Sequence, residues 1–325
     1  SKTGKDTIEH MIREWQTFLF RKGMSKCFPR SEMIPKVYIM SNAYECRSFF
    51  RQMYREKKKG FKIPKWILKK PWIHKGEGVD IIGSTKGQEL WKEFYGGRKC
   101  GFPTGYITQV YINNPLTISG RKFDLRVYMM ISSTNPLVVF YHDGFLRVSV
   151  NKYDKSSDSK SSGLTNIAVA KNNKKEKIIE NENTMSMEEF QEYLLKSSKT
   201  KDGTIVREHI IPQIKRQMIH KVLALEPYLK KGKTYFEVSG VDYMVDSSFN
   251  VWFIEMNRGP AWSEIRVNLK ERLLHEMADF IDAKMDGKFT TKELPYRYWE
   301  PIIDKSLPRS ERYFGLLEGK CVNIQ

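Results

Sequence analysis

The chain has 325 residues, of which 40% are hydrophobic and 13% aromatic, which is enough apolar material for one large domain or two lobes with a folded core and excludes an intrinsically disordered protein. Its 56 Lys and Arg residues exceed its 38 Asp and Glu residues, so the formal net charge is +18. Such a field attracts a polyanion, namely an acidic protein tail, nucleic acid or an acidic lipid surface.

The cysteines and the lengths of the apolar runs further restrict the class of protein. The four cysteines are scattered and form no CxxC pair, which predicts reduced thiols in the cytosol and neither a zinc site nor a disulfide framework. No apolar run approaches the roughly 20 residues of a membrane span, and the first residues lack a signal-peptide core. We therefore expect no membrane partner, and the missing initiator Met is consistent with an excised fragment or a tagged protein.

The first third of the chain reads as helices followed by short strands. Residues 1–60 hold two amphipathic stretches at helical spacing, the second ending before Gly60. A short strand is predicted at 66–68, and a glycine loop leads into another strand over 75–82. Further strands rich in β-branched and aromatic residues are predicted at 106–112 and 123–132.

The middle of the chain predicts a hairpin and then a polar loop. Residues 137–150 alternate as two strands would, with His142, Asp143 and Gly144 as the turn, because an Asp-Gly pair tolerates the positive φ of tight turns. The Ser- and Lys-rich stretch 151–163 can bury almost nothing and is expected to be a mobile loop.

The last part alternates helices and strands. A helix opens near Met185, and another covers 208–226 with apolar residues three and four apart. Strands at 234–245 and 250–256 follow, and a final helix covers 263–284. The whole pattern predicts an α+β fold.

The two predicted strands near the C-terminal end place carboxylates together. Glu255 and Asn257 are two apart on a strand and share a face. If Asp246 pairs with Val251 across the turn, Asp242 falls opposite Glu255. Two facing carboxylates repel unless a cation lies between them, and oxygen ligands of this kind suit Mg²⁺. The alternative is a solvated acidic pair on an exposed hairpin face.

A magnesium site of this type predicts a nucleotide. Gly76 and Gly78 would let backbone N–H groups approach phosphate oxygens, and Lys75 and Lys69 would supply positive charge. Neither a P-loop nor a dinucleotide-binding GxGxxG motif occurs. The nucleotide would then lie between sheets, although glycine pairs and exposed lysines are also common without any ligand.

Positive charge also lies on the central predicted strands. Lys122, Asp124 and Arg126 alternate along one strand and share a face, and Arg147 lies on the strand opposite. Phosphoryl and acyl-phosphate chemistry needs fixed positive charge where negative charge develops, and the planar fork of Arg suits that role. A solvated strand face is the alternative interpretation.

Five blocks of sequence resemble the tubulin tyrosine ligase-like family in order and spacing. They are WILKKPWIHKGEGV, QVYINNPLTISGRKFDLRVYMMI, LRVS, LTN and FEVSGVDYMVDSSFNVWFIEMNRGP. The resemblance covers roughly residues 28–285. It implies an ATP-grasp fold and an enzyme that joins an amino acid to a protein carboxylate, usually on the acidic tail of tubulin.

The resemblance also implies roles for individual residues. Spacing to the glycine loop favours Lys69 over Lys70 as the first phosphate lysine. Implied as catalytic are Arg126, Arg147 and Glu255, and as ligands of Mg²⁺ Asp242, Glu255 and Asn257. The residues implied to bind ATP are Lys69, Lys75, Gly76, Gly78, the adenine hinge Gln109, Val110, Tyr111 and Ile112, and Lys122, Asp124 and Asn166.

The predicted fold class is α+β of the ATP-grasp type, with the nucleotide held between two antiparallel-rich sheets and flanking helices. Four segments are expected: a helical part at 1–60 that is consistent with a truncated preceding lobe, a central subdomain at 61–115 with lid and hinge, a C-terminal subdomain at 116–290 with the Mg²⁺ and ATP site, and an extension at 291–325.

The expected function is an ATP-dependent ligase that adds tyrosine, glutamate or glycine to an acidic tail through an acyl-phosphate. The expected partners are tubulin or another acidic protein tail and a free amino acid. The protein itself is expected to be a monomer in the cytoplasm, at microtubules or cilia. A catalytically inactive protein that binds microtubules or acidic tails is the alternative. Nucleic-acid binding is disfavoured, because the aromatic residues follow apolar patterns rather than forming a stacking platform.

Overall fold

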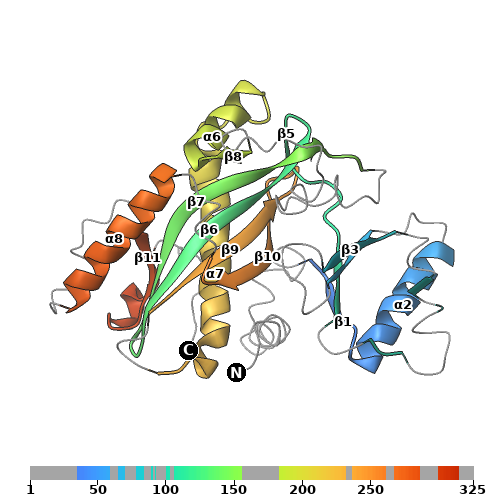
Figure 1. Cartoon of the computed structure of the whole chain (residues 1–325), viewed down its shortest axis with the longest axis horizontal. Helices are drawn as coiled ribbons and strands as arrows, with labels where there is room; N and C mark the ends of the chain where they lie inside the picture. Colours follow the sequence, from blue (N-terminus) through green and yellow to red (C-terminus); the bar gives the residue numbers. More distant parts are fainter. Residues whose placement is uncertain are drawn as a thin grey trace.

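The structure, a computed structural model, describes residues 35–58, 65–69, 78–83, 89–90, 92, 100–102, 106–155, 183–231, 236–260, 267–285 and 299–314. These residues form two antiparallel sheets with helices packed against them, which confirms the α+β class (Figure 1). No helix in the described ranges is long and apolar enough to cross a membrane. The predicted helix at the start of the chain lies outside the described residues.

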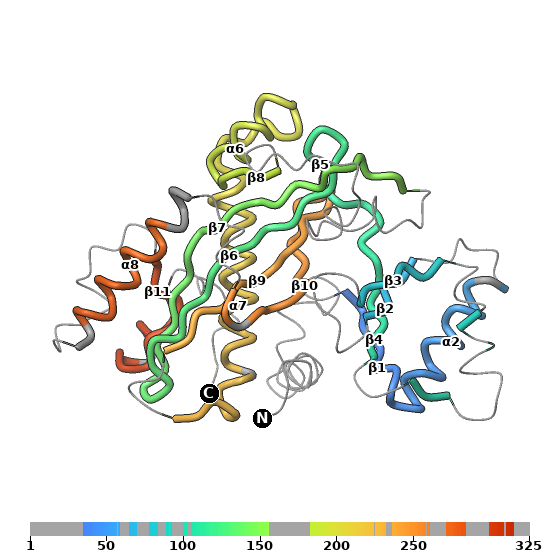
Figure 2. The backbone as a smooth tube through the Cα atoms, viewed as in Figure 1, coloured from blue at the N-terminus to red at the C-terminus, as the bar shows by residue number. Residues whose placement is uncertain are grey.

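The smaller sheet has four strands and carries one helix. Its strands in order are β1 (Val37–Ile39), β4 (Ile107–Val110), β2 (Trp66–Lys69) and β3 (Val79–Ile82). Helix α2 (Ala43–Lys58) packs its apolar side onto this sheet, where Phe49 and Phe50 lie buried with Trp66. Helix α2 lies on the side of this sheet that faces away from the larger sheet (Figure 2).

The larger sheet has seven strands. Across its main path they are β10 (Val251–Arg258), β9 (Glu237–Val245), β6 (Arg121–Thr134), β7 (Leu137–Lys152) and β11 (Trp299–Asp304), with β5 (Thr117–Ile118) paired to β6 and β8 (Thr184–Met185) paired to β7. The helical elements after β7 are α6 (Met187–Lys196), the π-helical turn η3 (Val206–Ile210), α7 (Ile211–Leu225), the 3-10 turn η4 (Glu226–Tyr228), α8 (Val267–Met285) and the 3-10 turn η6 (Arg309–Glu311).

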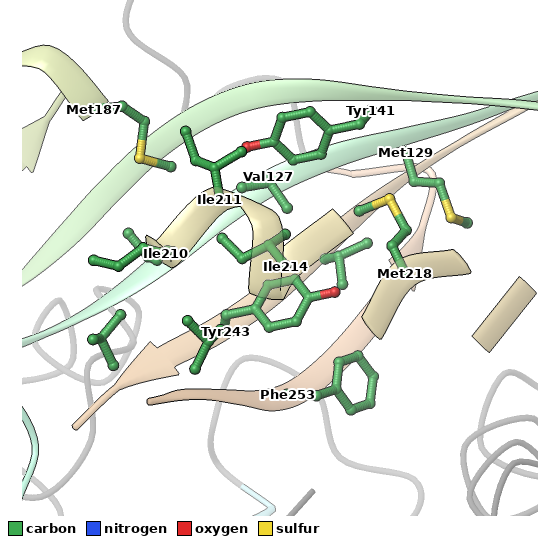
Figure 3. Packing of buried hydrophobic residues seen from close by; sticks show 14 of the residues in the cluster. Val127, Met129, Tyr141, Met187, Ile210, Ile211, Ile214, Met218, Tyr243 and Phe253 are labelled. Carbon is green, nitrogen blue, oxygen red and sulfur yellow. The ribbon is translucent and has the colours of Figure 1, made fainter. Parts of the chain in front are cut away.

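Two hydrophobic cores lie on opposite faces of the larger sheet, and strand β6 contributes side chains to both. Its odd-numbered residues, such as Val127 and Met129, pack against Ile214 and Met218 of α7 (Figure 3). Its even-numbered residues at the far end pack with α8. The strand is therefore buried on both faces, and the predicted alternation of polar and apolar positions is confirmed: Lys122, Asp124 and Arg126 lie on the face opposite to α7.

The predicted hairpin over 137–150 is wrong. Strand β7 runs without a break, and the chain reverses earlier, at the Asn135-Pro136 pair between β6 and β7. Asp143 and Gly144 form a bulge opposite Val127, since the residues on either side of them pair normally with β6. Gly144 serves close backbone approach and not positive φ, because a Cβ there would lie 2.9 Å from the Cα of Val127.

The prediction of reduced thiols is also wrong for the described cysteines. Cys46 on α2 and Cys100 form a disulfide, with Cα atoms 5.9 Å apart and both side chains buried. The two residues are 54 positions apart in sequence, so only the tertiary fold brings them together. Cys27 and Cys321 lie outside the described residues.

A buried lysine on α7 gives the first testable prediction. The Nζ of Lys221 lies 3.0 Å from the ring centroid of Phe253 and 3.4 Å from the hydroxyl oxygen of Tyr243. Burial lowers the pKa of Lys221 well below its usual value. The unfolded chain therefore binds the proton more tightly, so the free energy of unfolding should rise with pH until the ordinary lysine pKa is reached.

We expect Lys221→Met to raise the free energy of unfolding at pH 7 by about 1–3 kcal/mol, because it removes the cost of burying the amine. Urea unfolding followed by circular dichroism at pH 7 and pH 9 measures both the gain and its decrease toward pH 9. Lys152→Met, at an exposed position, is the control. A lower stability of Lys221→Met at both pH values would contradict the prediction.

Candidate active site

A ladder of charged side chains crosses the larger sheet at the end nearest the smaller sheet. Backbone register places Asp124 of β6 opposite Arg147 of β7, and Arg126 of β6 opposite Asp242 of β9. On the next strand, Glu255 of β10 lies opposite Asp242. Charged residues from four adjacent strands therefore lie side by side. Asp124 and Arg126 share one face of β6, as the predicted alternation requires.

The pairing of Asp242 with Glu255 is confirmed, although by a route that the sequence did not reveal. The turn was expected to pair Asp246 with Val251, whereas Val251 pairs with Val245. A one-residue bulge just before Glu255 shifts the register back by one position. The two errors cancel, and the carboxylates meet as predicted.

Asp242 is held by two guanidinium groups. Arg126 donates to it with both Nε and Nη2, the Nη2 contact being 2.8 Å, and Arg147 Nη2 donates to Asp242 Oδ2 at 3.0 Å. Arg147 Nε also donates to Asp124 Oδ1 at 2.6 Å. Burial by itself would raise the pKa of Asp242, but the charges and hydrogen bonds of Arg147 and Arg126 outweigh it and hold that pKa below its usual value.

Three further polar groups adjoin Asp242. The Nδ2 of Asn257 donates to Glu255 Oε1 at 3.1 Å, which confirms that these two side chains share a face. Lys69, from the smaller sheet, donates with Nζ to the carbonyl oxygen of Ile254 at 3.4 Å. Burial lowers the pKa of Lys69, while the nearby charges of Glu255 and Asp242 act in the opposite direction. One lysine of the smaller sheet therefore reaches the carboxylate face of the larger one.

The donor set fits a hard divalent cation such as Mg²⁺. Two carboxylates and one amide lie at neighbouring positions of β9 and β10. Within the described ranges, no group of three His, Cys, Asp or Glu side chains could hold a metal ion. At this site the third oxygen donor would be the amide of Asn257. Both carboxylate oxygens of Asp242 already accept hydrogen bonds from arginines. A cation would therefore take its oxygen ligands first from Glu255 and Asn257.

The predicted hinge is partly paired within the protein. Val110 N–H donates to the carbonyl oxygen of Lys36 at 2.8 Å, and Tyr111 N–H donates to that of Lys65 at 2.9 Å. The side chain of Gln109 is buried. Among the described residues, no acceptor is found for the N–H of Ile112.

Lys122 is buried between aromatic rings beside this hinge. Its Nζ donates to the Tyr111 hydroxyl at 3.0 Å and lies 4.3 Å from that ring centroid and 5.4 Å from the centroid of Tyr153. Burial lowers the pKa of Lys122 to about 7, with the charge of Asp124 acting in the opposite direction. A lysine that titrates near neutrality can respond to an anion placed next to it.

Some predicted site residues are not placed, and two glycines were missed. Lys75, Gly76 and Asn166 lie outside the described residues, and Gly78 is a buried turn residue just before β3. A Cβ on Gly240 would lie 3.0 Å from Arg126 Cδ, so this glycine leaves room for the arginine. Gly144 does the same for the Arg126 backbone. For Gly240 the available indication is a glycine inside a predicted strand, whereas Gly144 is predicted to lie in a turn.

Two antiparallel sheets that meet beside a cluster of lysine, arginine and carboxylate side chains are the architecture expected of an ATP-grasp protein. The chain belongs to the Tubulin-tyrosine ligase family, whose sequence profile matches residues 5–286. This assignment confirms the family resemblance and the ATP-grasp-like fold.

Individual relatives agree with that assignment. The chain is 32% identical over 244 residues to human "Inactive polyglycylase TTLL10", covering 71% of this chain and 35% of that protein. It is 31% identical over 229 residues to "Tubulin glycylase 3C" of Tetrahymena thermophila, covering 66% and 20%. It is 28% identical over 284 residues to human "Probable tubulin polyglutamylase TTLL2", covering 84% and 43%. The chain thus spans less than half the length of these curated relatives.

Proposed function

We propose that this chain is an ATP-dependent ligase that joins a free amino acid to a glutamate carboxylate of an acidic protein tail, most plainly that of tubulin. The observation that carries the proposal is the meeting of Lys69, Arg126 and Arg147 with Asp242 and Glu255 at one end of the larger sheet. Family membership and the names of the relatives support the same activity.

The charges of this cluster argue for a nucleotide that carries a metal. Three carboxylates, of Asp124, Asp242 and Glu255, face three cations. The cluster is close to neutral, so a bare triphosphate would meet little net attraction. Glu255, Asn257 and Asp242 would hold Mg²⁺, which when bound neutralises phosphate charge and fixes the phosphate oxygens.

The remaining binding roles follow from position. Lys69 would contact the phosphates, and the N–H of Ile112 would donate to the adenine ring. Lys122, between the hinge and the ladder, would lie beside the nucleotide. Lys75, Gly76, Gly78 and Asn166 stay proposed phosphate contacts on the strength of the family resemblance.

The reaction takes two steps. An acceptor carboxylate oxygen attacks the γ-phosphorus of ATP, and ADP leaves. The amine of the free amino acid then attacks the acyl carbon, inorganic phosphate leaves with the C–O bonding pair, and the ammonium proton passes to solvent. Arg126 and Arg147, fixed by their carboxylate partners, would stabilise the negative charge that develops on the transferred phosphoryl and acyl oxygens.

Nucleotide affinity should fall as the pH rises above 7. The pKa of Lys122 is about 7 in the ligand-free protein, and a neighbouring phosphate would raise it. Binding then takes up a proton, so the dissociation constant for ATP increases by up to about tenfold per pH unit above 7. Isothermal titration calorimetry at pH 7 and 8.5, in two buffers of different ionisation enthalpy, measures both the affinity and the proton uptake.

Lys122→Gln is the matched variant and should show a weaker dependence on pH. Some dependence remains, since Lys69 also has a pKa lowered by burial. Equal affinity at both pH values with no proton uptake would show that Lys122 does not contact the nucleotide.

The amino acid added is glycine, glutamate or tyrosine, and the names of the relatives favour glycine or glutamate. Mass spectrometry of tubulin tails, after incubation with ATP, Mg²⁺ and each amino acid in turn, tests the proposal. ATP-dependent addition of one residue type supports it. Binding of tubulin without any addition would instead support the alternative of a catalytically inactive protein that binds acidic tails. In either case we propose association with microtubules in the cytoplasm.

A further inference from the structure

One face of helix α2 combines positive charge with exposed aromatic rings. Tyr44 is 73% exposed and Tyr54 is 65% exposed, the highest values among large hydrophobic residues in the described part of the chain. Between and beyond them lie the exposed side chains of Arg47, Arg51, Arg55 and Lys58. At about 100° per residue, these six side chains fall within roughly 100° of arc on the helix. We call them the α2 stripe.

The acidic residues of the same helix do not neutralise this stripe. Glu45 accepts a hydrogen bond from the backbone N–H of Ile39 at 2.7 Å, so it faces the sheet. Glu56 accepts from Gln52 Nε2 at 2.8 Å on the same flank. The opposite side of the helix is buried in the small core with Phe49 and Phe50. Sequence and packing therefore leave an outward face that carries only cations and tyrosines.

A face of this kind is more than an ordinary solvated helix surface. Tyr and Arg are among the residues enriched where proteins bind one another, and here they lie together along one face of a single helix. Arg47, Arg51 and Arg55 are four residues apart, so they repeat at about 6 Å along the helix. Alternate side chains of an extended peptide repeat at about 6.6 Å. Successive arginines could thus each meet a carboxylate on one side of the peptide.

We propose that the α2 stripe is a docking surface for an extended glutamate-rich peptide, outside the reaction centre. The proposal rests on the proposed function, since it assigns the acceptor tail a second contact. Each arginine would form a charge-assisted hydrogen bond with a carboxylate, and the tyrosines would cover the aliphatic stems of glutamate side chains. Because α2 lies on the side of the smaller sheet away from the ladder, the peptide segment bound there is not the segment that reacts (Figure 1).

The test compares two triple variants that lose the same charge. Arg47→Gln/Arg51→Gln/Arg55→Gln removes the arginines of the stripe. Lys152→Gln/Lys199→Gln/Lys201→Gln removes three exposed lysines elsewhere. The probe is a fluorescein-labelled peptide of ten glutamates, and fluorescence anisotropy at about 0.1 M salt, where charges screen over about 10 Å, gives its dissociation constant.

The stripe variant should bind the peptide at least about tenfold more weakly, because a tenfold loss corresponds to at least one charge-assisted contact. The lysine variant should bind it less than about twofold more weakly. Arg47→Lys/Arg51→Lys/Arg55→Lys keeps the charge without the planar fork and should fall between. Since all three arginines are exposed, circular dichroism should show an unchanged fold.

Equal weakening by both triple variants would show that the overall charge of +18 attracts the peptide and would overturn the proposal. The proposal would also be overturned if none of the variants changed the affinity for the peptide. It would likewise be overturned if the arginines were needed to bind a ten-nucleotide RNA and the peptide did not bind. These measurements need neither ATP nor an amino acid. If ligation fails while stripe-dependent binding persists, only the proposed function falls. If ligation occurs and the KM for the decaglutamate acceptor is the same with and without the arginines, only the docking surface falls.

Discussion

Glu255→Gln should lower ATP-dependent ligation by on the order of a hundred- to a thousandfold in a protein that remains folded. The substitution keeps the shape of the side chain but removes one of the three negative charges of the ladder. In the proposed site, the cation of MgATP would then lose a carboxylate oxygen ligand beside Asn257, with which Glu255 shares a hydrogen bond. Single-turnover transfer of a radiolabelled amino acid to tubulin measures the loss.

The control for this prediction is Glu300→Gln on β11, at the far edge of the same sheet. Glu300 forms a surface ion pair with Lys215 and lies away from the ladder, so its loss should cost less than about 1 kcal/mol of stability and leave ligation unchanged. Nucleotide binding by Glu255→Gln should also lose its dependence on Mg²⁺. Ligation by this variant at the rate of the unmodified protein would remove Glu255 from the reaction centre.

Gly144→Ala should destabilise the fold by about 3 kcal/mol or more and remove nucleotide binding with it. A Cβ at this bulge would overlap the carbonyl oxygen of Arg126 and lie 2.7 Å from its carbonyl carbon. These are backbone atoms of a central strand, so they cannot move aside as the end of a side chain could. Strand β7 would have to separate from β6 where Arg126 is paired with Asp242. Urea unfolding and calorimetric titration with ATP measure the two losses.

Gly203→Ala is the matched control. Its added Cβ would meet nothing within 4 Å, so its free energy of unfolding should change by less than about 1 kcal/mol. If Gly144→Ala proved as stable as Gly203→Ala, the close approach of β7 to the Arg126 backbone would not hold Arg126 in place. The comparison therefore tests whether the bulge at Asp143 and Gly144, which was predicted to be a turn, holds Arg126 in its position in the site.

The sequence was sufficient wherever the answer depends on neighbours along one strand or one turn. The alternation of β6 fixes the face of Lys122, Asp124 and Arg126, because side chains of a strand point alternately to opposite sides. The same period puts Glu255 and Asn257 together. Periodicity likewise predicts α2 and α7, since amphipathic spacing is a local property.

Contacts between distant segments were decided by the tertiary structure alone. Asp143 and Gly144 carry the composition of a hairpin turn, yet pairing along the whole of β6 makes them a bulge within β7. Strand β11 joins the edge of the sheet and Cys46 meets Cys100 across 54 residues, neither of which spacing reveals. Local preferences amount to about 1 kcal/mol per residue, and the burial and pairing of whole elements outweigh them. The sequence by itself therefore determined which side chains share a face, and the packing of the sheets determined which faces meet.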